Sequence, residues 1–126
     1  DTISTCDNME KIYWAMKRTV EENFSGVRFI SHSSHWYDWG CMNYSRFIID
    51  EPPDDEQECI RLHNRIWNAG VRAAIANGGV INDHHGVGLK LGRLMKEAYG
   101  PAMQVLTGIK KQLDPNGIMN PYKMGL

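Results

Sequence analysis

The sequence predicts an α+β fold, in which a small, mainly antiparallel sheet is packed by helices and followed by a C-terminal helical tail. Apolar residues recur at three- and four-residue spacing over residues 9–20 and again over 56–76, a pattern typical of amphipathic helices. Between these segments lie two short apolar runs, 27–31 and 41–50, which predict strands. A final helical pattern over residues 102–113 predicts the tail.

The composition is that of an ordinary folded domain. The chain has 126 residues, 42% hydrophobic and 23% charged, with a net charge of −1 and interspersed signs, so we expect neither nucleic acid nor an anionic membrane as partner. No apolar run is long enough to span a bilayer, and no signal peptide is visible. Three cysteines without CxxC spacing argue against a disulfide framework or a structural zinc site and favour the cytoplasm.

The first half of the chain predicts one helix and two strands. Residues 4–7 offer helix N-cap candidates, and Gly26 ends the helix that follows them. The segment 31–40 predicts a polar and aromatic connection between the strands. It contains His32, His35, Trp36, Tyr37 and Trp39.

In the second half, Pro52-Pro53 stops the second strand, and Asp54 or Asp55 is placed to cap the next helix. That helix is predicted over residues 56–76, and Asn77-Gly78-Gly79 ends it. Residues 80–81 predict a short strand, and further helices are predicted over 89–99 and 102–113. The predicted buried faces are Ile60, His63, Trp67, Val71 and Ala74 in the long helix, and Ala102, Leu106, Ile109 and Leu113 in the last one.

The strongest functional signal is a loop with two adjacent histidines, His84 and His85, between glycine-rich stretches. Histidine exchanges protons near neutral pH, and consecutive side chains of an extended loop point to opposite sides. The segment Gly86-Val87-Gly88 precedes a predicted helix, where its amides could receive an anion or simply form a tight turn. The two histidines could equally cap that helix.

Three motifs together resemble the carboxyl end of the FAD-linked oxidases. They are Gly78-Gly79-Val80-Ile81, Asp83-His84-His85-Gly86-Val87-Gly88, and Leu113-Asp114-Pro115-Asn116-Gly117-Ile118-Met119-Asn120-Pro121. These are the flavoproteins grouped with vanillyl-alcohol oxidase, D-lactate dehydrogenase and alkyldihydroxyacetonephosphate synthase. The resemblance implies a ferredoxin-like cap and FAD as cofactor. It also implies that residues 1–126 are the later part of the cap plus the returning tail, with the FAD-binding domain upstream as partner.

Many 2-hydroxyacid dehydrogenases of this family hold a divalent metal with two histidines and a glutamate. The resemblance places Tyr37 and Tyr44 at the two histidine positions, His84 at the glutamate, and His85 at the histidine after it. Phenols are poor zinc ligands beside imidazole and carboxylate, so we predict no metal here. The spacing of His32 and His35 does not change that prediction, because no acidic residue lies at suitable spacing.

The same positions resemble alkyldihydroxyacetonephosphate synthase more closely. Its tyrosine-rich segment matches Tyr37-Asp38-Trp39-Gly40 and Tyr44, and its histidine run followed by Gly-Val-Gly matches residues 84–88. Two departures stand out. The first of the synthase's three histidines is Asp83 here, and its lysine after Gly-Val-Gly is displaced, because Leu89 precedes Lys90.

The sequence thus predicts the substrate-binding domain of an FAD-dependent oxidoreductase that oxidises a small hydroxyacid or alcohol by hydride transfer to flavin. The alternatives are a synthase-like non-redox flavin exchange and a non-catalytic binding module; a homodimer is possible. A neighbouring guanidinium stabilises an ionised phenol, which favours Tyr44 beside Arg46 as a base. The predicted roles are catalytic for Tyr44, His85 and Tyr37, cofactor-binding for His84 and Asn120, and substrate-binding for Arg46, Lys90 and Arg93.

Overall fold

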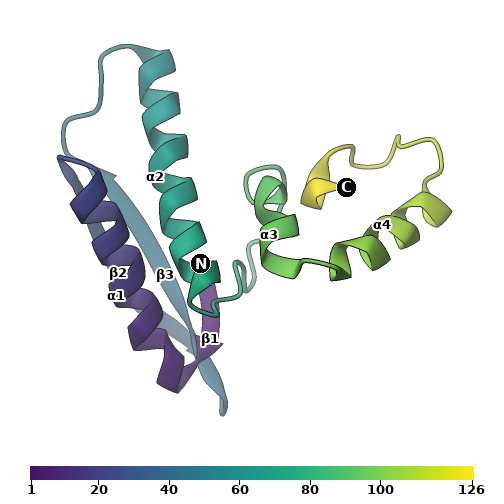
Figure 1. Ribbon diagram of the computed structural model, residues 1–126, viewed down its shortest axis with the longest axis horizontal. Helices are drawn as coiled ribbons and strands as arrows, with labels where there is room; N and C mark the ends of the chain where they lie inside the picture. Colours follow the sequence, from purple (N-terminus) through teal and green to yellow (C-terminus); the bar gives the residue numbers. More distant parts are fainter. The chain divides into compact units, whose positions relative to one another are not determined.

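The computed structural model describes residues 1–126, which form two compact units, 1–84 and 85–126. The first unit contains β1 (Thr2–Thr5), α1 (Cys6–Asn23), β2 (Val27–Trp36), β3 (Gly40–Ile49) and α2 (Glu56–Ala76) (Figure 1). The second contains a 3₁₀ helix (Gly92–Leu94), α3 (Met95–Tyr99), α4 (Ala102–Leu113) and a second 3₁₀ helix (Lys123–Gly125). None of these helices is both long and apolar enough to cross a membrane.

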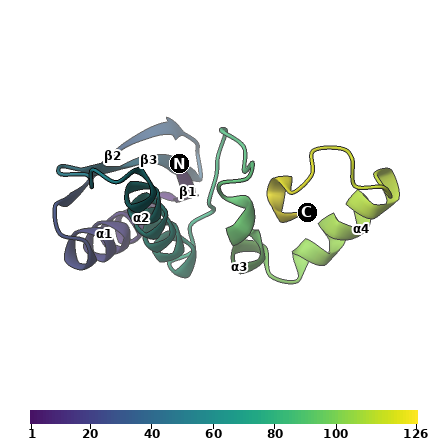
Figure 2. The same cartoon turned by 90° about the horizontal axis from the view of Figure 1, so that it is seen from above.

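The sheet of the first unit has the order β1-β3-β2, and β3 runs antiparallel to both neighbours. Strands β1 and β2 are therefore parallel to each other with β3 between them, the arrangement of a split β-α-β motif. Helices α1 and α2 cover one face of this sheet and leave the other face without a helix (Figure 2). The predicted α+β class is confirmed.

The core lies between the sheet and the two helices. One cluster of buried residues joins Ile12 and Met16 of α1 to Phe29 of β2 and Ala74 of α2. A second joins Val20, Val27 and Ile66. Phe47 of β3 packs against both clusters, so its ring connects the two halves of the core.

The long helix α2 has the predicted bounds but a different buried face. Asp55 is its N-cap and accepts a hydrogen bond from the Glu58 amide at 2.7 Å, as the sequence indicated. Its buried residues are Ile66, Gly70, Val71 and Ala74, whereas Ile60 is 46% exposed. The predicted face is wrong in its first turns, because the helix packs where Gly70 lets the Phe47 ring approach.

The connection predicted over residues 31–40 is mostly strand. Pairing with β3 extends β2 to Trp36, with His32 opposite Tyr44 and Ser34 opposite Met42. Polar side chains are tolerated there because they lie on the face that no helix covers or at the end of the ladder. Three of the four tryptophans are exposed: Trp14 by 45%, Trp36 by 70% and Trp39 by 57%.

The second unit is less helical than predicted over residues 89–99. Gly86 and Gly88 have φ values of 80° and 53°, so the chain turns here. A 3₁₀ helix begins at Gly92, and α-helix begins only at Met95. Helix α4 has the predicted bounds, but its buried residue is Met103, whereas Ile109 is 52% and Leu113 76% exposed. Most of the apolar stripe predicted on α4 is therefore exposed within this unit of 42 residues.

Candidate functional site

A bulge in β2 gives His35 its position. Ser34 pairs with Met42 and Trp36 with Cys41, so His35 is an extra residue between two registered pairs. Its φ of 49° lies in the left-handed region, which costs energy for a residue with a side chain. A bulge of this kind redirects a side chain out of the alternation of the strand. His35 is 45% exposed in its side chain and points to the loop that follows α2.

Asp83 is the centre of the resulting cluster. Its Oδ2 lies 2.8 Å from Nδ1 of His35 and 3.2 Å from Nδ1 of His84, and Tyr37 donates its hydroxyl to Oδ1 at 3.3 Å. The two imidazole rings have centroids 4.4 Å apart. The cluster therefore joins β2, the β2–β3 turn and the histidine loop. The sequence interpretation included Tyr37 and His84. It considered His35 only as a possible metal ligand together with His32 and rejected it, and it treated Asp83 only as a departure from the family.

The side chain of Asp1 anchors the backbone of the histidine loop at residues 83 and 84. Its carboxylate oxygen accepts hydrogen bonds from the backbone amides of Asp83 at 2.7 Å and His84 at 3.2 Å. The same oxygen lies 3.5 Å from Nδ1 of His84, and only 2% of the Asp1 side chain is exposed. Two consecutive amides on one buried carboxylate fix the local backbone, so His84 is a positioned residue on an ordered loop.

The surroundings of the cluster shift the pKa values of Asp83 and Tyr37 in opposite directions. Hydrogen bonding to His35 lowers the pKa of Asp83, with further hydrogen bonds from His84 and Tyr37 acting against the desolvation. Desolvation raises the pKa of Tyr37, and the charge of Asp83 adds to this effect. At neutral pH Asp83 is therefore anionic and Tyr37 keeps its proton. Tyr37 is suited to donating a proton or a hydrogen bond rather than to removing one.

Tyr44 lies in a second, separate group of residues on the face of the sheet without helices. Its ring stacks on His32 with centroids 5.2 Å apart, and the guanidinium carbon of Arg46 lies 5.3 Å from the ring centre. Around them is a hollow of about 120 Å³. It is lined by Ile30, Ser31, His32, Tyr44 and Arg46. Tyr44 and Arg46 therefore lie close together, as the sequence predicted.

The other predicted residues belong to the second unit, where His85 is the first residue. Burial lowers the pKa of Lys90, and the charge of Arg93 lowers it further, so these two cations are neighbours. Asn120 has a φ of 48°, in the left-handed region, although the proline that follows it favours an extended conformation. The reversal follows a compact turn in which the Lys123 amide donates to the Asn120 carbonyl at 3.3 Å.

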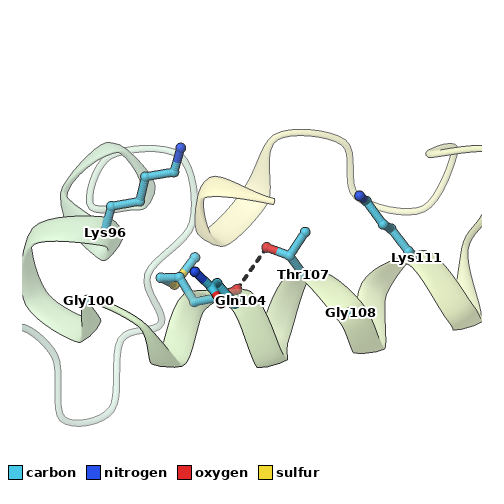
Figure 3. A pocket seen from close by; sticks show the side chains of 7 residues that line it. Lys96, Gly100, Gln104, Thr107, Gly108 and Lys111 are labelled. Atoms are coloured by element: carbon cyan, nitrogen blue, oxygen red, sulfur yellow. Dashed lines mark hydrogen bonds between the residues drawn. The ribbon is translucent and has the colours of Figure 1, made fainter.

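The second unit also has a groove of about 590 Å³ along α4 (Figure 3). It is lined by Lys96, Gly100, Met103, Gln104, Thr107, Gly108 and Lys111. The Thr107 hydroxyl donates a hydrogen bond to the Met103 carbonyl of the same helix at 2.8 Å. Lys96 and Lys111 lie at opposite ends of the groove (Figure 3). The polar side chains that line it do not converge on one point. We therefore place the candidate site in the first unit.

The two tyrosines at the family's histidine positions do not suit metal ligation. Tyr37 stands at one of the metal positions, and its raised pKa keeps its oxygen protonated, which a metal ligand cannot be. Tyr44 at the other position stacks on His32 instead of joining the Asp83 cluster. A half-buried phenol, an exposed imidazole and an exposed guanidinium on the uncovered sheet face form a donor set suited to a small polar substrate.

The chain is similar to proteins described as an FAD-linked oxidoreductase, as D-lactate dehydrogenases and as an alkyldihydroxyacetonephosphate synthase. A 92-residue stretch is 37% identical to the uncharacterized FAD-linked oxidoreductase YgcU of Escherichia coli strain K12, covering 71% of this chain and 19% of that protein. A probable mitochondrial D-lactate dehydrogenase of Danio rerio is 38% identical over 68% of this chain and 17% of its own length. The alkyldihydroxyacetonephosphate synthase of Trypanosoma brucei brucei is 27% identical over 83% and 17%.

The chain therefore spans about a fifth or less of the length of these relatives. The sequence model of the family described as FAD linked oxidases, C-terminal domain, matches residues 1–124, almost the whole chain. The predicted resemblance is thus confirmed: this chain belongs to the C-terminal domain family of the FAD-linked oxidases.

Proposed function

We propose that this chain is the substrate-binding domain of an FAD-dependent oxidoreductase that oxidises a small hydroxyacid or alcohol. One observation carries the proposal: Tyr44 and Arg46 lie side by side around a hollow on the uncovered face of the sheet. Guanidinium groups bind carboxylates through paired hydrogen bonds, and a phenol is a group that transfers protons. The hollow has room for a small molecule only.

In this proposal the chain's own residues bind the substrate and handle its protons. Arg46 holds the substrate carboxylate. Within the second unit, the neighbouring cations Lys90 and Arg93 are proposed separately to bind an anionic group of the substrate. Tyr44 receives the proton that leaves the substrate, and Tyr37 keeps its proton for donation. His85, in the second unit, is proposed as a further proton-transfer group. His84 and Asn120 are proposed to contact the cofactor. FAD, when bound by the complete protein, supplies the acceptor for the hydride.

The relatives support the hydroxyacid as substrate class. Several carry names of D-lactate or D-2-hydroxyglutarate dehydrogenases, including an Arabidopsis thaliana D-lactate dehydrogenase that is 39% identical over 68% of this chain. Both named substrates are short 2-hydroxy carboxylates. A carboxylate beside a carbinol carbon matches a site with Arg46 next to Tyr44.

The test is a visible spectrum of the purified full-length protein, recorded anaerobically before and after adding 2-hydroxyacids. We expect a yellow protein whose flavin band bleaches. Tyr44→Phe should slow the bleaching by about 100-fold, the usual loss when a proton-transfer group is removed. Tyr13→Phe, a tyrosine packed between helix and sheet, is the matched control and should change it little. A protein that holds no FAD would refute the proposal.

A second function has one observation in its favour. The synthase relative covers 83% of this chain, more than the dehydrogenases do, and Lys90 lies beside Arg93, a pair able to bind a phosphate. A yellow protein that no hydroxyacid bleaches, but that binds a phosphate-bearing carbonyl compound, would move the assignment to a non-redox exchange.

A further inference from the structure

Two imidazoles and one carboxylate in the first unit converge on a single point from separate elements. His35 comes from the bulge of β2, and Asp83 and His84 come from the loop after α2. One potential ligand atom from each of His35, Asp83 and His84 lies within 4.8 Å of the other two. We propose that His35, Asp83 and His84 bind a divalent first-row transition metal ion, with zinc as its representative.

The distances suit such an ion. In a tetrahedral site with bonds of about 2.0–2.1 Å, neighbouring ligand atoms are roughly 3.3 Å apart. Oδ2 of Asp83 is 2.8 Å from one imidazole nitrogen and 3.2 Å from the other, so small shifts open the cluster to the required size. Imidazole and carboxylate are ligands that zinc, nickel and copper ions accept, whereas calcium and magnesium prefer oxygen alone.

The surroundings resemble the second layer of contacts around a metal site. The Tyr37 hydroxyl donates to Asp83 and lies 3.3 Å from Oδ1 and 3.5 Å from Oδ2, a contact that orients a ligating carboxylate. Asp1, almost fully buried, fixes the backbone of both Asp83 and His84. The two histidine side chains remain 45% and 38% exposed, which gives an ion a path of entry.

The backbone of His35 adds an independent indication. A left-handed φ of 49° on a residue with a side chain costs energy, and the bulge that imposes it directs the imidazole at Asp83. Such strain is typical of functional positions. His32, three residues earlier in the same strand, follows the regular alternation and stacks on Tyr44 instead.

This set differs from the family's two-histidine-and-glutamate ligands. Those positions fall here on Tyr37, Tyr44 and His84, so His35 and Asp83 lie outside them. Three protein ligands leave at least one coordination position to water or to an anionic ligand. The proposal needs no flavin chemistry, and it stands or falls separately from the proposed oxidation.

The experiment is a titration of the chelator-treated, purified protein with Zn²⁺ against a chromophoric zinc indicator. We expect one ion per chain, and at least about 10-fold weaker binding in His35→Ala and in Asp83→Asn. His32→Ala is the matched control and should bind Zn²⁺ as the unchanged protein does. Tyr37→Phe keeps all three ligands and is expected to weaken binding by less than either ligand variant.

A second measurement keeps the test independent of folding and activity. Diethylpyrocarbonate modifies exposed imidazoles, and peptide mass spectrometry locates the modified residues. Zn²⁺ should protect His35 and His84 but leave His32 reactive. Zinc binding that is equal in the unchanged protein, His35→Ala and Asp83→Asn would overturn the proposal. Absence of one-to-one binding, or binding without protection of these two histidines, would do the same.

Discussion

The substitution Gly70→Ala should destabilise the first unit although it improves the helix propensity of α2. A Cβ added at Gly70 would lie 2.4 Å from Cζ and 2.8 Å from Cε1 of Phe47. The Phe47 ring cannot retreat cheaply, because it packs against both core clusters, with Phe29 and Trp67 at ring-centroid distances of 5.8 Å and 5.9 Å. The ring must therefore tilt or α2 must move away from β3.

The magnitude follows from two opposing terms. Replacing glycine by alanine inside a helix gains about 1 kcal/mol. Overpacking a well-filled core costs about 1–3 kcal/mol, and contacts below 3 Å at two ring atoms place Gly70 toward the upper part of that range. We expect a net loss of about 1–2 kcal/mol in the free energy of unfolding.

The assay is urea unfolding followed by tryptophan fluorescence, which reports on the first unit because all four tryptophans lie within residues 1–84. Gly108→Ala is the matched control, since a Cβ at this position of α4 meets nothing within 4 Å. Gly108→Ala should stabilise the second unit by about 0.5–1 kcal/mol, measured as unfolding followed by circular dichroism. Combining Gly70→Ala with Phe47→Leu should remove most of the loss. A Gly70→Ala protein as stable as the unchanged one would refute this reasoning.

Three further outcomes are expected. The lowered pKa of Asp83 means that its interactions stabilise the fold above the unfolded value near 3.9 and are lost as pH falls through the lower folded value. Acid unfolding between about pH 5 and 2 should therefore be less steep in Asp83→Asn. Asp114 accepts hydrogen bonds from the Ile118 amide at 3.0 Å and from the amide after it, so Asp114→Ala should speed hydrogen exchange at those amides by roughly tenfold. Burial raises the pKa of the Cys41 thiol, and Cys6 is exposed, so a thiol reagent at neutral pH should label Cys6 well before Cys41, as counted by mass spectrometry.

The sequence predicted those elements whose signals are local. The apolar stripe of α1 is buried as expected at Met9, Ile12, Met16 and Val20. The bounds of α2 agree because an N-capping Asp55 and a glycine-rich end are both written within a few residues of the helix. The strands predicted at 27–31 and 41–50 are also present, within β2 and β3, because short apolar runs mark them locally.

The features that depend on pairing over long distances could not be predicted in this way. Strand β1 has four residues and pairs with β3 about forty positions later, so nothing nearby in the sequence distinguishes it from the start of α1. The bulge at His35 depends on the register between β2 and β3, which the composition of residues 31–40 does not contain. Because the bulge was missed, His35 was assigned to a connection and its meeting with Asp83 was not foreseen.

The position of the histidine loop depends on β1 more than on the loop's own glycines. On one side β1 pairs with β3; on the other, Ile3 and Val80 exchange two backbone hydrogen bonds of 3.0 Å and 2.9 Å. Asp1 then extends this contact to the amides of Asp83 and His84. The loop is thus registered against the same sheet that carries His35, through a strand of four residues. Displacing β1 would move Asp83 relative to His35 without altering either residue, so the geometry of the cluster is a property of the sheet.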